Sequence, residues 1–547
     1  MAQRPQAVFG CPIIVHPAAT LGNTAWLTAS ALEWIRFRHA STSLEQTQRH
    51  WLKSCLQKNS ATEFGKAQKF GEIRGWEDYS KNVPIRSYET FKPSIDRILS
   101  GVQNVLTKQR VSLLEPTSGS TGPAKLIPYT RSLQIEFRRA VASWMVSTFL
   151  AHPKLLTGRA YWSLTPMMPE PGQYKTEIPV GFADDSAYLG GAVQSLIQRT
   201  LVTPPQLGRV TDMDFYWRLT VLLLLKCRDL RLISVWHPSF INLILKYMRE
   251  NWDQLLLDLR NGYAISYPEL KVHPDFIRAR ELEHMNPASP MEIWPQLELI
   301  SCWTDANAAN CLREILSTFP GVSLQPKGLL ATEAFVTIPL GDLRPLAIRS
   351  HFFEFLDEEG QVHASWQLKQ GRQYTVIVTT GGGLYRYNLG DRIEVDGFWR
   401  QIPSLRFIGK DASISDYFGE KLSESFVSKV LKDLLETCCP NPGFAMLALE
   451  DSGDQTAYAL YLETRTMIPE DLDARLDNAL RENPHYDLCT RLGQLGATRI
   501  VPVADNSFHN YTMRQVAHGM RLGDIKPASL SNLKNWHDHL QVKPGPR

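Results

Sequence analysis

The chain has 547 residues, with 59 Lys and Arg against 56 Asp and Glu, so its formal net charge is only +3. Hydrophobic residues make up 43% and charged residues 21%, which excludes a largely disordered chain. No block of basic residues stands out, and the longest apolar run, 219–225, is far shorter than the roughly 20 residues that span a bilayer. We therefore expect a folded protein that has neither nucleic acid nor a membrane as its partner.

Cysteine usage suggests a cellular compartment. The eight cysteines include no C-x-x-C pair, and the adjacent Cys438 and Cys439 are too close in sequence to act as a zinc-binding pair. The sequence therefore predicts reduced thiols and a cytoplasmic location.

The N-terminal part of the chain is predicted to be mostly helical. Residues 44–59 carry apolar side chains at helical spacing, which predicts a helix there. A short apolar run, 111–114, then leads into a segment rich in hydroxyl side chains and glycine, and a long helix is expected over 132–149.

Two strand–helix units are predicted between residues 230 and 340. The apolar runs 230–236 and 297–303 are each followed by a helical pattern, and a short strand is expected at 322–325. Apolar strands that alternate with helices favour a parallel sheet covered on both faces.

The pattern changes after about residue 411. Two neighbouring strands are expected at 444–449 and 457–462, followed by a helix and a further strand at 499–503. The predicted fold class is therefore α/β. A large N-terminal domain with mostly parallel sheets would span 1–410, and a small α+β domain would span 411–547.

The sharpest local signal is a loop of four hydroxyl side chains and two glycines. Glycine lets backbone N–H groups turn inward and hydroxyls add donors, so such a loop can surround phosphate oxygens. It is not a Walker loop, because no Gly-Lys-Ser/Thr closes it. The alternative is a polar surface turn. The six residues are Thr117, Ser118, Gly119, Ser120, Thr121 and Gly122.

Three later segments also carry polar groups. Glu333 follows the predicted strand at 322–325 and could hold Mg²⁺, which takes one or two carboxylates plus substrate phosphates. Asp391 follows three glycines and a Tyr-Arg-Tyr stretch and could bind a ribose diol. Lys526 lies on a Gly-punctuated loop near the C-terminus. Taken singly, these could instead be a solvated loop acid, a capping aspartate and a solvated lysine.

The order of these segments is typical of adenylate-forming enzymes. More narrowly, the chain resembles the auxin-responsive Gretchen Hagen family of acyl acid–amido synthetases, in its bacterial or animal-like branch. The resemblance covers most of the chain, including segments 62–65, 83–89, 104–106, 301–303, 325–333, 419–424 and 521–527. Departures are Ala334, where the family often has Gly, and the run Gly381–Gly383. Neither removes a functional group.

The resemblance implies the role of each site residue. The loop 117–122 would bind the β- and γ-phosphates of ATP, Glu333 would hold Mg²⁺, and Lys526 would be the catalytic lysine of a C-terminal lid that swings about a hinge near Lys410 and Asp411. The remaining nucleotide-facing positions would be Gly328 along the adenine, Thr332 at the α-phosphate, Asp391 at the ribose with Tyr387 nearby, and Lys421 facing the nucleotide.

The implied reaction has two steps. A carboxylic acid attacks ATP with release of pyrophosphate, and an amine, expected to be an amino acid, then takes the acyl group and releases AMP. An enzyme that passes the acyl group to coenzyme A or a carrier thiol, or a degenerate nucleotide-binding member, are the alternatives. Trp303 and the strip 161–166 could line the acid pocket, although aromatic residues on strands usually belong to the core.

Overall fold

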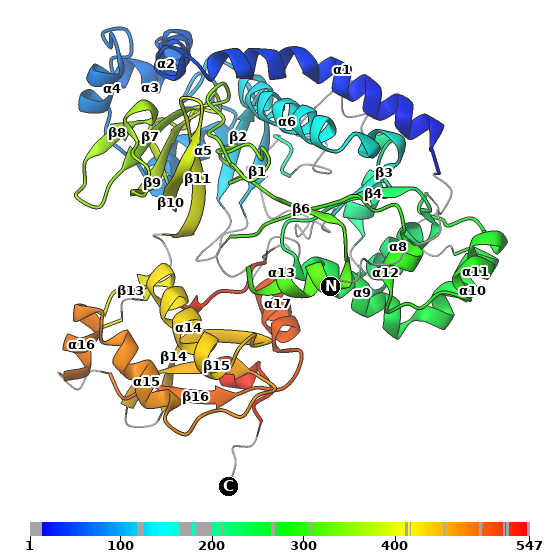
Figure 1. Ribbon diagram of the computed structural model, residues 1–547. Coiled ribbons are helices and arrows are strands. Elements are labelled where there is room, and N and C mark those ends of the chain that lie inside the picture. The colour runs from blue at the N-terminus through cyan, green and yellow to red at the C-terminus, as the bar shows by residue number, and fades with distance from the viewer. Residues whose placement is uncertain are drawn as a thin grey trace, which may run out of the picture.

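The computed structural model describes most of the chain. The described residues are 14–117, 125–164, 178–181, 198–210, 212–263, 269–305, 309–410, 414–415, 417–418, 420–452, 455–491, 495–517, 520 and 525–543. Figure 1 shows three regions: helices over an antiparallel sheet, a parallel sheet with its own helices, and a C-terminal α+β unit below both. No helix in the described part of the chain is long and apolar enough to cross a bilayer.

The N-terminal region is helical, as predicted. Its second helix has the predicted bounds, because its apolar side chains recur at helical spacing and pack into the core. The long helix α6 lies beneath α1 (Figure 1). The elements are α1 (Pro17–Ala40), α2 (Leu44–Asn59), α3 (Glu63–Ala67), α4 (Trp76–Asn82), α5 (Tyr88–Leu99), β1 (Val111–Pro116), β2 (Leu126–Thr130) and α6 (Arg131–Ala151).

The predicted parallel sheet is confirmed. Its four strands are ordered β3-β4-β5-β6 and all pair in parallel, with a hydrophobic core of their own against the following helices. The strands are β3 (Arg159–Trp162), β4 (Leu230–Ser234), β5 (Leu299–Cys302) and β6 (Ser323–Pro326). The helices are α8 (Met213–Lys226), α9 (Ser239–Glu250), α10 (Trp252–Asn261), α11 (Phe276–Leu282), α12 (Pro290–Ile293) and α13 (Ala309–Thr318).

A five-stranded antiparallel sheet, which the sequence analysis does not identify, packs against the N-terminal helices. Its strand order is β11-β10-β9-β7-β8, and it shares one core with α2, α5 and α6. The strands are β7 (Phe352–Leu356), β8 (Val362–Ala364), β9 (Gln373–Thr379), β10 (Tyr387–Trp399) and β11 (Ile402–Lys410).

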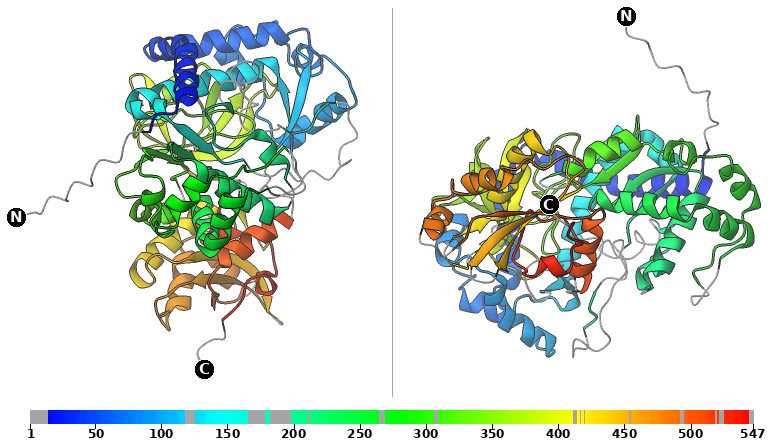
Figure 2. Two further views of the ribbon diagram at one scale, coloured as in Figure 1. Left: turned by 90° about the vertical axis from the view of Figure 1, so that its right-hand side faces the viewer. Right: turned by 90° about the horizontal axis from the view of Figure 1, so that it is seen from below.

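The C-terminal unit contains the predicted strands and the predicted helix, together with further helices. Side chains of β14 and β15 alternate between two cores, one on each face of the sheet β16-β15-β14-β17, which is why these strands carry apolar residues on both sides. The left view of Figure 2 shows this unit at the lower end of the molecule. Its elements are β12 (Ile414–Ser415), β13 (Leu422–Ser423), α14 (Glu424–Cys438), β14 (Phe444–Ser452), β15 (Gln455–Glu463), α15 (Leu472–Leu480), α16 (Pro484–Arg491), β16 (Arg499–Pro502), α17 (Ser507–Ala517) and β17 (Leu530–Ser531).

Candidate active site

A tight turn after β6 presents Thr332 and Glu333. The backbone N–H of Ala331 donates to the carbonyl of Ala334 at 3.0 Å, and that of Ala334 donates back to Ala331 at 3.2 Å. The two residues between them therefore occupy the tip of the turn. Glu333 is buried there, so its carboxylate faces the protein interior and does not extend into bulk water. Ala334, the departure from the family pattern, is fully buried and completes this turn.

Gly328, in the same segment, has a packing role. A Cβ atom at this position would overlap the carbonyl oxygen of Thr337, while the hydroxyl of Thr337 accepts from the N–H of Leu329 at 2.7 Å. Close approach of two backbones thus requires glycine here. This requirement exists whether or not an adenine ring lies against the segment.

Tyr387 joins the turn to the first residues of β10. Its hydroxyl donates to Oε1 of Glu333 at 3.2 Å, and Asp391 lies four residues further along the same strand, also buried. Burial, with the negative charges of Glu333 and Asp391, raises the pKa of Tyr387 well above its usual range. Tyr387 therefore remains a protonated donor between two carboxylates that come from different parts of the sequence.

The predicted phosphate loop begins and ends beside this turn. Its flanking strands β1 and β2 pair antiparallel, and the N–H of Thr117 donates to the carbonyl of Lys125 at 2.8 Å, which closes the base of the loop. The hydroxyl of Tyr129, on β2, donates to the carbonyl of Thr332 at 2.6 Å. Residues Ser118, Gly119, Ser120, Thr121 and Gly122 lie outside the described residues.

Tyr88 links the base of the loop to Tyr387. Its hydroxyl accepts from the N–H of Leu126 at 2.9 Å, the ammonium of Lys125 lies 5.7 Å from its ring centroid, and it is among the groups that raise the pKa of Tyr387. Sequence reasoning assigned no role to Tyr88 or Tyr129. The available signal for Tyr88 was its place in segment 83–89, one of the stretches that carry the family resemblance.

Lys526 reaches the parallel sheet from the C-terminal unit. Its Nζ lies 4.1 Å from the ring centroid of Trp303, the residue that follows β5. Burial and the charge of Lys526 lower the pKa of His237, just beyond β4, to about 3. Both contacts lie at the carboxyl ends of the strands, which is where open parallel sheets bind their ligands.

The two other lysines are placed differently. Lys421 is exposed, adopts a left-handed backbone with φ of 44°, and its carbonyl accepts from Nδ2 of Asn483 at 3.1 Å. The contact described for it thus lies within the C-terminal unit, and its nucleotide-facing role stays a prediction. Lys410 pairs through its backbone with Asp391 at the end of β11. The expected hinge residue Asp411 lies outside the described residues.

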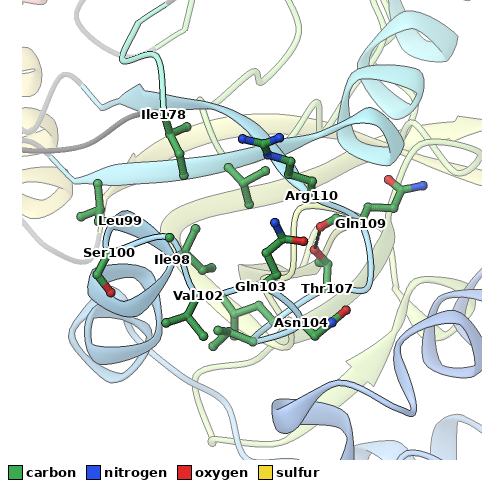
Figure 3. A pocket seen from close by; sticks show the side chains of 14 residues that line it. Ile98, Leu99, Ser100, Val102, Gln103, Asn104, Thr107, Gln109, Arg110 and Ile178 are labelled. Atoms are coloured by element: carbon green, nitrogen blue, oxygen red, sulfur yellow. Dashed lines mark hydrogen bonds between the residues drawn. The ribbon is translucent and has the colours of Figure 1, made fainter.

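A separate groove of about 490 Å³ opens beside α5 and β1. Figure 3 shows the apolar side chains Leu99 and Ile178 on one side of it and Gln109 and Arg110 on the other. None of the site residues predicted from the sequence lines this groove. It therefore adds nothing to the assignment of the active site.

The residues around Tyr387 suit a magnesium ion carried by a nucleotide. Within the described ranges, no three or more His, Cys, Asp or Glu side chains converge as a self-contained metal site. Glu333 offers a single buried carboxylate. Mg²⁺ is commonly held by one or two carboxylates with the remaining ligands from phosphates and water, so this donor set fits that ion.

Comparison with known proteins finds matches along most of the chain. Three family models match consecutive parts of the chain: the GH3 family N-terminal domain over 34–324, the GH3 family central domain over 345–410 and the GH3 family C-terminal domain over 425–535. A probable indole-3-acetic acid-amido synthetase, GH3.7, of Oryza sativa subsp. japonica is 25% identical over 449 residues, which cover 69% of this chain and 70% of that protein.

Two further relatives support the same grouping. The indole-3-acetic acid-amido synthetase GH3.15 of Arabidopsis thaliana is 23% identical over 434 residues, covering 72% of each chain. The solved structure of AtGH3.15 acyl acid amido synthetase in complex with 2,4-DB superimposes with a TM-score of 0.79 at 19% identity, over 96% of this chain and 98% of the other, and so establishes the fold. Because the three family models together match most of the sequence, the chain belongs to the GH3 family.

Proposed function

We propose that this protein is an ATP-dependent acyl acid–amido synthetase. It adenylates a carboxylic acid with release of pyrophosphate and then transfers the acyl group to an amine, with an amino acid as the expected acceptor. The observation that carries the proposal is the position of Tyr387, which donates to Glu333 and lies on the same strand as Asp391. Three of the segments singled out in the sequence therefore meet in one place, because Tyr129 also joins the phosphate-loop strands to Thr332.

Each site residue has a role in this proposal. The loop 117–122 binds the β- and γ-phosphates, Asp391 accepts hydrogen bonds from the ribose hydroxyls, and Lys526 stabilises the charge that develops on the α-phosphate. The remaining assignments are Gly328 beside the adenine, Thr332 at the α-phosphate, Tyr387 next to the ribose, and Lys410 and Lys421 near the nucleotide. Glu333 would hold Mg²⁺, which would neutralise charge on the phosphate oxygens.

The chemistry requires charge stabilisation more than proton transfer in its first step. The acid's carboxylate oxygen forms a bond to the α-phosphorus while the bond to pyrophosphate breaks, and negative charge spreads over the phosphoryl oxygens. A preorganised lysine placed against these oxygens lowers the barrier. In the second step the amine nitrogen bonds to the acyl carbon, and AMP leaves with the electrons of the acyl–phosphate bond.

The proposal includes a division of the chain into an adenylation domain, 1–410, and a mobile lid, 411–547. The ends of the family models support it, because the central domain stops at 410 and the C-terminal domain starts at 425. We also place the protein in the cytoplasm. The thiols of Cys55, Cys227, Cys438 and Cys439 are not in disulfides, as expected there.

The test separates the two half-reactions. The purified protein is given ATP, Mg²⁺ and a panel of carboxylic acids, and acid-dependent exchange of labelled pyrophosphate into ATP is measured. Productive acids are then incubated with amino acids or with coenzyme A, and the products are weighed by mass spectrometry. Amide products support the proposal, thioester products make the protein a thioester ligase, and no exchange with any acid contradicts adenylation.

A matched pair of variants tests the lysine. Lys526→Ala should slow pyrophosphate exchange by about 10²–10³-fold, the usual effect of removing one charge-stabilising donor. The control is Lys543→Ala, because Lys543 is exposed near the C-terminus and lies 3.8 Å from Asp505 in a surface ion pair. Near-normal exchange in the Lys526 variant would exclude the lysine from this role.

A further inference from the structure

Trp303 lies where three parts of the chain meet. It follows β5 in the segment matched by the N-terminal family model, and its ring packs edge-on against Phe407 of β11, with centroids 5.3 Å apart and planes at 67°. Its face receives the ammonium of Lys526 from the C-terminal unit at 4.1 Å. The indole itself is buried, with 4% of its surface exposed, so its orientation is fixed by packing.

The backbone around Trp303 is also held firmly. Its N–H donates to the carbonyl of Trp236 at 2.8 Å, which ties the ends of β5 and β4 together. Two residues further on, Asp305 accepts from the N–H of Phe407 at 3.1 Å and from the guanidinium of Arg344 at 2.7 Å. The indole is thus part of the rigid edge of the sheet, while Lys526 is the long, flexible partner.

The backbone at Lys526 is held by contacts within the C-terminal unit. The hydroxyl of Tyr511, on α17, donates to the carbonyl of Lys526 at 3.1 Å, and the Tyr511 ring stacks on Trp536 at 5.3 Å. From the same helix, Phe508 lies 6.2 Å from the ring of His237. The C-terminal unit therefore contacts the edge of the parallel sheet at two neighbouring points, Trp303 and His237.

We propose that Trp303 is a positioning residue for Lys526: its indole face holds the lysine ammonium at the carboxyl ends of the parallel strands, where the lysine acts in adenylate formation. The inference rests on the proposed function and adds a residue to it. An ammonium over an indole face is attracted by the negative charge of the π-system, and because Lys526 is exposed the attraction has the size usual at a solvent-accessible site. The contact also confines a side chain that would otherwise sample many rotamers.

His237 is compatible with an ammonium group at this position because its imidazole is uncharged. A protonated imidazole beside Lys526 would repel the ammonium, but burial together with the lysine charge lowers the pKa of His237 to about 3. At neutral pH the cation therefore has a neutral ring beside it and an indole face beneath it.

The activity test is a double-mutant cycle. Trp303→Leu removes the π face and should lower kcat for pyrophosphate exchange about 2- to 5-fold, with KM for ATP unchanged, since only the placement of the lysine is lost. Trp303→Phe keeps a ring and should lose less. In a Lys526→Ala background, Trp303→Leu should have no further effect. Trp399→Leu is the control, because Trp399 has its own cation contact with Arg400 at 5.4 Å, between neighbouring residues of another region.

A chemical measurement tests the contact between Lys526 and Trp303 without an enzyme assay. Reductive methylation of the folded protein, quantified by mass spectrometry, should modify Lys526 about 2- to 5-fold faster in Trp303→Leu than in the wild type, with Lys421, which is exposed like Lys526, as internal reference. Equal labelling of Lys526 in both proteins, or losses that add in the double mutant, would overturn the proposal. Absence of pyrophosphate exchange in the wild type would instead count against the proposed function, and the labelling comparison would still decide the role of Trp303.

Discussion

The hydroxyl of Tyr387 donates a 3.2 Å hydrogen bond to Oε1 of Glu333, a residue 54 positions earlier in the chain. Glu333 lies in the turn that follows β6 of the parallel sheet, and Tyr387 is the first residue of β10 in the antiparallel sheet. The contact therefore aligns the two sheets at the point where the proposed nucleotide site is built.

Glu333 should be required for the metal-dependent step. Glu333→Gln keeps the size of the side chain but removes the charge that would hold Mg²⁺, so we expect pyrophosphate exchange to fall about 10²–10³-fold and the Mg²⁺ requirement to rise. Tyr387→Phe is the matched control. It removes one hydrogen bond and should cost about tenfold with the Mg²⁺ titration unchanged. An unaltered Mg²⁺ titration in the Gln variant would argue against a metal at Glu333.

Asp391 should affect the binding of ATP more than turnover. Asp391→Ala removes a buried acceptor at the proposed ribose site, so KM for ATP should rise about 10- to 100-fold, while kcat at saturating ATP changes less. Glu394→Ala serves as control, because Glu394 lies on the same strand and forms a 2.9 Å ion pair with Arg406 near the surface. A loss confined to kcat would contradict the ribose contact.

His237 should make stability depend on pH. Its pKa is about 3 in the folded protein and about 6.5 in an unfolded chain, so the unfolded state binds the extra proton between these values. Its contribution is complete above pH 6.5 and declines as the pH falls, by about 1.4 kcal/mol per unit. The wild type should thus lose roughly 2 kcal/mol more than His237→Gln between pH 6.5 and pH 5.

Urea denaturation of both proteins at the two pH values checks this. His50→Gln, at an exposed position of α2, is the control and should show no such difference from the wild type. Parallel losses of stability in the wild type and in His237→Gln would mean that the imidazole is not held neutral in the fold.

Arg386 should be the costliest ion-pair residue to remove. Its Nε donates to Oε2 of Glu354 at 2.9 Å, both side chains are buried, and the same guanidinium also donates to the carbonyls of Ser80 and Val83. Arg386→Met leaves the buried carboxylate of Glu354 without its cation, while Trp76 Nε1 still donates to Oε1, and should cost about 3–5 kcal/mol in the free energy of unfolding.

Thermal and denaturant unfolding measure this loss. Arg406→Met breaks a partly exposed pair with Glu394 and should cost less than about 1 kcal/mol. Similar losses in the two variants would show that burial does not set the strength of the Arg386 pair.

The strand–helix units could be predicted because their signals are local. The apolar runs before α9 and α13 became β4 and β5, and α2 has the bounds that its periodicity indicates. The run Gly381–Gly383 lies in the connection between β9 and β10. Its glycine content has a reason that the sequence does not display: a Cβ at Gly381 would overlap Glu136 of α6, and Gly383 has a φ of 99°.

The contacts that build the site could not be predicted in the same way. The bonds from Tyr129 to Thr332 and from Tyr387 to Glu333 join residues that are far apart in sequence, so no periodic pattern marks them. The contact of Lys526 with Trp303 depends on how the C-terminal unit lies against the sheet edge, which is a property of the whole fold. The family resemblance identified the candidate site residues, but it did not indicate which side chains contact them.

The position of Trp303 has a practical consequence. Indole emission responds to the charge and water around the ring, and this ring is buried beneath the ammonium of Lys526. Any movement that lifts the C-terminal unit from the sheet would expose it to solvent. The difference in fluorescence between the wild type and a Trp303→Phe protein would then report whether the C-terminal unit separates from the sheet, without an attached dye.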